Sequence, residues 1–338
     1  MTPAIFGCSG PVLTDDERAF FKDADPVGYI LFGRNCIDRA PLRALTDSLR
    51  EIHGRDRLMI SIDQEGGRVR RLRPPEWRDH PAGDAYAALY RKAPISAIEA
   101  ARIGARLIAH ELAEVGISVD YHPPLDVRRP DAHDVIGDRA LGEDAMQVAA
   151  LGRAILEGLA LEGVVGCIKH MPGHGRTTTD THKSLPTVTA SAEELETDLA
   201  PFRSLKDAPL GMTGHLLFTA WDAENPATLS PIVVRDIIRG SIGFDGLLLT
   251  DDIDMEALSG SVPERAERAI AAGCDVVLNC WAKMDEMVGI AERCGHLGEA
   301  SMARLDRVHQ AMETTADRAS PDELLAKRDA LLAVAERA

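Results

Sequence analysis

The chain has 338 residues, 45% of them hydrophobic and only 4% aromatic, which suffices for one large barrel or two ordinary domains. Its formal charge of −16 argues against a nucleic-acid partner, because the phosphate backbone would repel it. No apolar run approaches membrane-spanning length, and the first residues lack the basic, apolar and small-residue order of a signal peptide, so we expect a cytoplasmic protein without a membrane partner.

Short β-rich runs recur along the chain, with helical patterns between them. The runs predicted as strands are 4–8, 28–32, 58–63, 117–121, 164–170, 210–216, 246–250 and 274–279. Several are nearly continuous apolar segments, as expected for parallel strands that are buried on both faces. Between them, residues such as 98–115 place apolar side chains on one helical face.

Eight strands alternating with helices predict an α/β fold of the parallel (β/α)8 TIM-barrel type, with residues 1–338 forming a single domain. The alternative is a doubly wound open sheet, which would require a phosphate-binding G-x-G-x-x-G after the first strand. The sequence there, G-C-S-G at 7–10, does not supply one. The charged, helix-favouring tail from about residue 320 to 338 is expected to pack outside the barrel.

Polar residues follow six of the eight predicted strands. They are Arg34 and Asn35, Asp63, Asp126, Lys169 and His170, His215, and Asp251 and Asp252. Because the carboxyl ends of barrel strands share one rim, this pattern predicts a ligand pocket there. Asp251 could be a nucleophile, a general base or a metal ligand, or it could cap the next helix. Asp252 is expected to point the other way, because side chains alternate along an extended strand.

The loop after the fifth strand carries three histidines, a lysine and an aspartate between Lys169 and His182. Histidine titrates near neutrality, and an aspartate two residues away can orient its imidazole, which makes Asp180 and His182 a candidate acid/base pair. A second cluster, the arginines at 68, 70, 71 and 73, is either a solvated basic surface or a site for an anionic or hydroxyl-rich ligand.

Four segments together carry a family resemblance. They are G-Y-I-L-F-G-R-N at 28–35, I-D-Q-E-G-G-R-V at 62–69, K-H-M-P-G-H-G at 169–175 with D-T-H at 180–182, and G-F-D-G at 243–246 leading to T-D at 250–251. The chain resembles, from about residue 28 to 279, the bacterial β-N-acetylhexosaminidases of glycoside hydrolase family 3. The similarity is to the single-domain cytosolic type that acts in peptidoglycan recycling.

The resemblance implies that Asp251 is the nucleophile of a retaining mechanism and that His182 is the acid/base, tuned by Asp180. It implies that five residues bind the N-acetylglucosamine unit: Asp63, Arg71, Arg139, Lys169 and His170. The implied enzyme removes non-reducing terminal N-acetylglucosamine from muropeptides. We expect it to be a monomer that needs no cofactor and no metal. Two positions depart from the family pattern, Met171 and Arg176, and the role of His215 is open.

Four alternatives are open from sequence alone. A metal hydrolase on the same barrel would use as ligands His170, His174, His182, His215 and Asp251, although Lys169 would then place a positive charge beside the metal. A sugar-binding barrel without turnover would be expected to lack Asp251 or His182, and both are present. The other two keep the fold and change the reaction: attack assisted by the substrate's acetamido group, or phosphorolysis in place of hydrolysis.

Overall fold

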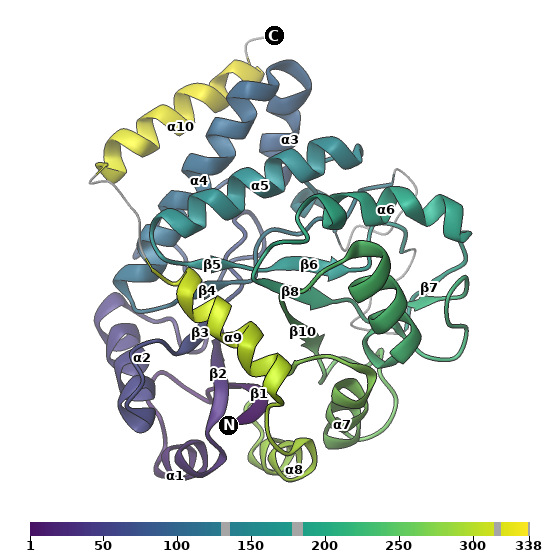
Figure 1. The fold of residues 1–338 in the computed structure, drawn as a ribbon. Helices are drawn as coiled ribbons and strands as arrows, with labels where there is room; N and C mark the ends of the chain where they lie inside the picture. The colour runs from purple at the N-terminus through teal and green to yellow at the C-terminus, as the bar shows by residue number, and fades with distance from the viewer. Residues whose placement is uncertain (130–135, 178–184, 314–318, 337–338) are drawn as a thin grey trace.

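The computed structural model describes residues 1–129, 136–177, 185–313 and 319–336 (Figure 1). At its centre, nine parallel strand segments pair in the order β5-β4-β3-β2-β1-β11-β10-β8-β6. The two outermost segments, β5 (Val165–Gly166) and β6 (Ile168–Met171), are consecutive pieces of one stretch of chain. Since β5 pairs with β4 and β6 pairs with β8, the sheet closes on itself as an eight-stranded barrel.

Each strand of the barrel overlaps a run predicted from the sequence. The remaining strands are β1 (Thr2–Gly7), β2 (Pro26–Leu31), β3 (Met59–Ile62), β4 (Val119–Asp120), β8 (Leu210–Thr213), β10 (Leu247–Asp252) and β11 (Val276–Asn279). The predicted (β/α)8 barrel is therefore confirmed, and the doubly wound open sheet is excluded because the barrel sheet has closed.

Helices cover the outside of the barrel. They are α1 (Asp15–Ala24), α2 (Arg39–His53), α3 (Gly83–Lys92), α4 (Pro94–Glu114), α5 (Ala145–Leu161), α6 (Ala192–Ser204), the π-helical η3 (Val233–Ile242), α7 (Val262–Ala272) and α8 (Met284–Cys294). Several begin where the sequence supplies a cap: Thr14 and Glu17 form a capping box at α1, and Ser191 and Glu194 form another at α6.

The amino-terminal end of the barrel is closed by α9 (Glu299–Ala311), which lies across the strands in Figure 1. Leu305 and Val308 of α9 join the buried apolar cluster that fills the barrel, together with Val27 and Val276. Burial of this apolar surface stabilises the plug and leaves the opposite rim, at the carboxyl ends of the strands, for a site.

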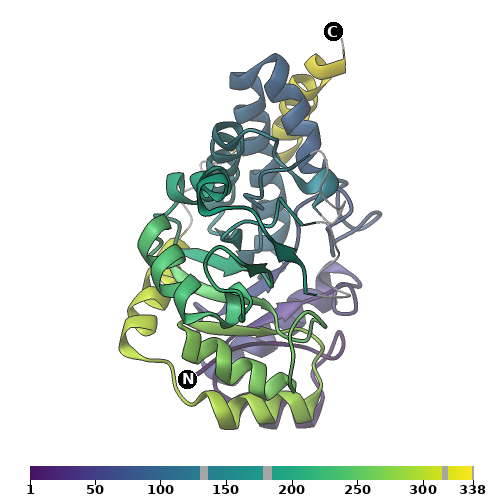
Figure 2. The same cartoon turned by 90° about the vertical axis from the view of Figure 1, so that its right-hand side faces the viewer.

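The last helix, α10 (Pro321–Glu336), packs outside the barrel against α3 and α4 (Figures 1 and 2). At the rim, β7 (Thr187–Val188) and β9 (Leu217–Phe218) form a separate two-stranded sheet, and short 3₁₀ turns η1 (Gly137–Arg139) and η2 (Ala227–Leu229) lie in the rim loops. Within the described ranges, no helix combines the length and the apolar character needed to cross a membrane.

Candidate active site

A pocket of about 310 Å³ lies at the carboxyl ends of the barrel strands. Six of the eight residues to which the resemblance assigns a role line it: Asp63, Arg71, Arg139, Lys169, His170 and Asp251. They come from the ends of β3, β6 and β10 and from two loops, so the barrel brings together side chains that are far apart in the chain. The other two, Asp180 and His182, lie outside the described residues.

Asp251 presents an ionised carboxylate to this pocket. Its Oδ1 accepts a hydrogen bond from the backbone N–H of Asp252 at 2.8 Å. Burial raises the pKa of this carboxyl, but the imidazoles of His215 and His170 and the N–H of Asp252 outweigh burial and hold the pKa below its usual range. His215 is buried and does not line the pocket; its Nε2 donates to the carbonyl oxygen of Asp252 at 2.9 Å.

Asp252 also lines the pocket, contrary to the expectation from strand alternation. The pairing of β10 with β11 shifts register between Leu249 and Asp252, and this irregularity breaks the alternation of side chains. Burial and the neighbouring carboxylate of Asp254 raise the pKa of Asp252 to about 8. Burial therefore favours the protonated form of Asp252 beside the ionised carboxylate of Asp251.

Lys169 links two carboxylates on the opposite wall, the half-buried Asp63 and the buried Glu65. Its Nζ is 3.0 Å from Oδ1 of Asp63 and 2.7 Å from Oε1 of Glu65. Arg139 binds Glu65 through two N–H groups at 2.9 and 2.7 Å, and Arg71 donates to Asp63 at 3.1 Å. Burial raises the pKa of Glu65, but Arg139 and Lys169 bring it well below its usual range. These alternating charges fix N–H donors and carboxylate acceptors at the pocket wall, the groups that bind sugar hydroxyls.

His170 is oriented by Asp126, which follows β4. The Nδ1 of His170 donates to Oδ2 of Asp126 at 2.8 Å, and Oδ1 accepts from the backbone N–H groups of His170 at 3.2 Å and His174 at 2.7 Å. Burial raises the pKa of Asp126, but His170 and the other donors lower it below its usual range. One carboxylate thus fixes both the imidazole and the start of the Pro-Gly loop.

That loop is held close to its neighbours. A Cβ on Gly175 would overlap the carbonyl oxygen of Val127, so only glycine fits there. Arg176 does not enter the pocket: its Nε donates to Oδ2 of Asp198 at 2.7 Å and its Nη2 donates to the carbonyl oxygen of Glu194 at 2.8 Å. This side chain therefore attaches the loop to α6.

The basic cluster at 68–73 is divided among separate partners. Arg68 pairs with Asp138 at 2.6 Å, and Arg70 pairs with Asp79. Arg71 pairs with Asp63 and stacks on Phe32, with its guanidinium carbon 5.0 Å from the ring centroid. The cluster is thus largely neutralised by carboxylates and does not present one continuous basic surface.

Two residues of this site have contacts that the sequence did not predict. Glu65 stands inside the segment 62–69, but its partner Arg139 is 74 positions away. Asp126 was expected at the rim without a specific contact.

Among the residues that the structure describes, no group of three or more His, Cys, Asp or Glu side chains is placed to hold a metal ion.

Residues 12–314 match the family model described as the glycosyl hydrolase family 3 N terminal domain. The chain belongs to glycosyl hydrolase family 3. It is 37% identical over 283 residues to a β-hexosaminidase of Bordetella avium, covering 82% of this chain and 80% of that protein. It is 38% identical over 288 residues to a β-hexosaminidase of Tolumonas auensis, covering 83% of each.

Two solved structures share the fold of nearly all of this chain. The crystal structure of NagZ from Neisseria gonorrhoeae in complex with N-trifluoroacetyl-D-glucosamine superimposes with a TM-score of 0.87 at 30% identity, over 99% of this chain and 98% of that one. A family 3 β-N-acetylglucosaminidase from Paenibacillus gives 0.86 at 31% identity, over 97% of this chain and 66% of that one. The family and the enzyme class predicted from the sequence, a glycoside hydrolase of the β-N-acetylhexosaminidase type, are confirmed.

Proposed function

We propose that this family 3 enzyme is a retaining, exo-acting β-N-acetylglucosaminidase that removes non-reducing terminal N-acetylglucosamine from muropeptides in the cytoplasm. The observation that carries the proposal is the ionised carboxylate of Asp251 facing a wall of fixed hydrogen-bonding groups across one pocket. A volume of about 310 Å³ is at the small end of ligand sites, which favours one terminal sugar over an internal segment of a chain. The proposal includes a single-domain monomer that needs no metal or cofactor.

In the proposed reaction, an oxygen of Asp251 attacks the anomeric carbon while the bond from that carbon to the leaving oxygen breaks. His182, oriented by Asp180, gives a proton to the leaving oxygen. The same histidine then removes a proton from a water molecule, whose oxygen attacks the anomeric carbon and releases Asp251 and N-acetylglucosamine. The two steps together retain the β configuration.

Sugar recognition is proposed for the opposite wall of the pocket. Asp63 offers acceptor oxygens, and Lys169, Arg71 and Arg139 offer N–H donors, which matches a ring with several hydroxyl groups. His170 donates its Nδ1–H to Asp126, so its Nε2 is left to face the sugar. Because these groups are already held by ion pairs, little side-chain freedom is lost when the sugar binds.

The substrate class is tested by comparing hydrolysis of an aryl β-N-acetylglucosaminide with that of the matching aryl β-glucoside. The proposal requires a preference for the N-acetylglucosaminide, and a preference for the glucoside would overturn it.

A fluorinated N-acetylglucosaminide separates the mechanisms, because a covalent adduct on Asp251 supports retention through the enzyme carboxylate. Repeated failure to trap that adduct would favour attack by the acetamido group.

His182→Ala should slow hydrolysis of natural disaccharides far more than hydrolysis of aryl glycosides. Aryl leaving groups of low pKa depart with little protonation, so they need the proton donor least. We expect a loss of about 10²–10⁴-fold in kcat/KM for an alkyl or sugar leaving group and a clearly smaller loss for nitrophenolate. Equal losses on both substrates would contradict the acid/base assignment.

A further inference from the structure

The β3–α3 loop, residues 63–82, carries Asp63 and Arg71 to the pocket and Glu65 to its ion pairs with Lys169 and Arg139. The loop turns back on itself. The backbone N–H of Gly67 donates to the carbonyl oxygen of His80 at 2.8 Å. A Cβ on Gly66 would overlap the carbonyl oxygen of Pro81, so the two ends of the loop pack directly against each other. The turn that presents Glu65 therefore rests on residues 80–81.

The middle of the loop is braced by Gln64. Its Oε1 accepts from the backbone N–H groups of Arg71 at 2.8 Å and Leu72 at 3.0 Å, and its Nε2 donates to the carbonyl oxygen of Leu72 at 3.1 Å. These bonds tie the strand end that bears Asp63 to the segment that bears Arg71. A shift of the loop base would consequently move Asp63, Glu65 and Arg71 together.

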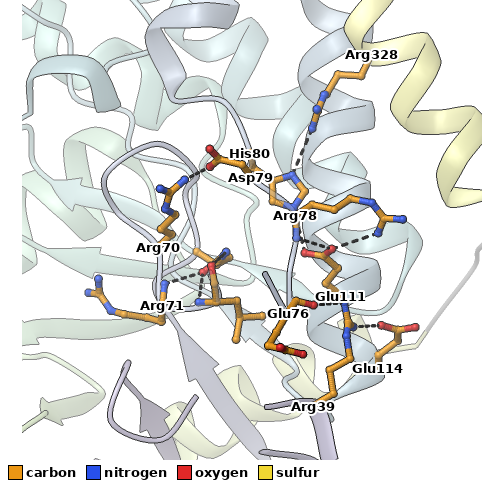
Figure 3. A network of polar contacts seen from close by, with 12 residues as sticks. Arg39, Arg70, Arg71, Glu76, Arg78, Asp79, His80, Glu111, Glu114 and Arg328 are labelled. Atoms are coloured by element: carbon orange, nitrogen blue, oxygen red, sulfur yellow. Dashed lines mark hydrogen bonds and ion pairs between the residues drawn. The ribbon is translucent and has the colours of Figure 1, made fainter. Parts of the chain in front are cut away.

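The base of the loop is held by a buried polar network (Figure 3). The His80 side chain is 1% exposed, and its Nε2 lies 3.1 Å from Oε2 of Glu111 on α4. Glu111 also accepts from the backbone N–H and the guanidinium of Arg78, both at 3.2 Å. Burial raises the pKa of Glu111, but His80 and Arg78 outweigh burial and bring it below its usual range.

The other side of the His80 ring faces the outermost helix. Nη1 of Arg328, on α10, lies 3.4 Å from Nδ1 of His80, and Figure 3 shows Arg328 reaching from α10 to the ring. Arg328 is only 4% exposed, and its stem runs close to α4, where a Cβ on Gly104 would lie 3.6 Å from the Arg328 Cδ.

These contacts select one form of the imidazole. A guanidinium has N–H donors and no acceptor, so Nδ1 of His80 must accept from Arg328. Nε2 then carries the hydrogen and donates to Glu111. Glu111 fixes the Nε2 side of the ring, and without Arg328 the ring would be held from that side alone, with Nδ1 left without its donor.

We propose that Arg328 of α10 is a positioning residue for sugar binding, acting through His80 on the β3–α3 loop. The substrate side of this inference rests on the proposed function, because Asp63 and Arg71 of the loop are among the residues assigned to the N-acetylglucosamine unit. Arg328 touches no substrate. It holds the loop base so that Asp63, Glu65 and Arg71 keep their distances to Lys169 and Arg139.

The test compares Arg328→Met, which keeps an apolar stem and removes the guanidinium, with Lys327→Met on the same helix. Lys327 is a matched control because its side chain is 57% exposed and pairs with Glu99 away from the loop. For Arg328→Met, we expect KM for an aryl β-N-acetylglucosaminide to rise about tenfold with kcat changed less than about twofold, as for loss of one hydrogen bond to a charged group that supports binding. Lys327→Met should leave both constants unchanged, and Arg328→Lys should recover part of the lost affinity.

Amide hydrogen exchange gives a readout that does not depend on activity. The Gly67 amide, bonded to the His80 carbonyl, should exchange faster in Arg328→Met than in the parent enzyme and in Lys327→Met. An unchanged KM together with unchanged Gly67 exchange would overturn the inference, as would equal effects of the Arg328 and Lys327 variants. If Arg328→Met does not fold, His80→Gln replaces it and must show the same increase in KM and in exchange. Failure of the parent enzyme to cleave the glycoside would sink the proposed function, whereas the exchange comparison still decides the role of Arg328.

Discussion

Asp251→Ala is expected to reduce kcat on an aryl β-N-acetylglucosaminide by roughly 10⁴-fold or more, because it removes the proposed nucleophile. The effect should fall on kcat more than on KM, since the hydrogen bonds assigned to sugar binding come from the opposite wall of the pocket. Steady-state kinetics on the purified variant measure it, with circular dichroism to show that the fold is intact. Residual activity within about tenfold of the parent would contradict the assignment.

The matched control for that experiment compares Asp252→Asn with Asp251→Asn. Asp252 lies next to Asp251 and lines the same pocket, but burial and Asp254 raise its pKa to about 8, so it is largely neutral at pH 7. An amide therefore replaces a protonated carboxyl of similar shape. We expect a loss much smaller than that of Asp251→Asn, which removes a charge, and comparable losses would show that the two carboxyls had been assigned to the wrong roles.

The barrel could be predicted because its signal is local. A strand such as β10 is buried on both faces, and its Leu-Leu-Leu run shows this directly in the sequence. The interruption at Cys167 that divides the fifth strand into β5 and β6 could not be predicted, because it depends on pairing with β4 on one side and β8 on the other. The polar residues after the strands likewise predicted that the pocket lies at the carboxyl ends of the strands, since each of them follows an apolar run.

The contacts within the site could not be predicted in the same way. Glu65 meets Arg139 across 74 residues, and His80 meets Arg328 across 248, between loops and helices that leave no periodic pattern in the sequence. Asp252 shows a second cause of failure. Alternation along an ideal strand places it outside, and a local register shift brings it into the pocket. The long-range contacts and the orientation of Asp252 both depend on tertiary packing, which no single segment of the sequence encodes.

Glu65→Ala should lower the free energy of unfolding by about 3–5 kcal/mol, because it leaves two buried cations without their shared counter-ion. The side chains of Lys169 and Arg139 are 2% and 13% exposed, so water screens them poorly once Glu65 is gone. Urea denaturation measures the change. The control is Glu313→Ala, which breaks the exposed pair with Arg57 and should cost no more than about 1 kcal/mol. Equal costs for the two variants would show that burial of the Glu65 network contributes nothing.

The pH dependence of stability, compared between the parent and Glu65→Gln, gives a stricter test of the electrostatic cause. The pKa of Glu65 lies well below its ordinary value of 4.5 in the folded chain, because Arg139 and Lys169 outweigh the burial that raises it. Folding therefore favours the ionised carboxylate, and this contribution is fully present above the unfolded pKa. It is lost progressively as the pH falls from about 4.5 toward the folded pKa. The difference in unfolding free energy between the parent and Glu65→Gln should accordingly be constant near neutrality and shrink on acidification. A difference that stayed constant across the acidic range would mean that Glu65 stabilises the pocket through packing and not through its charge.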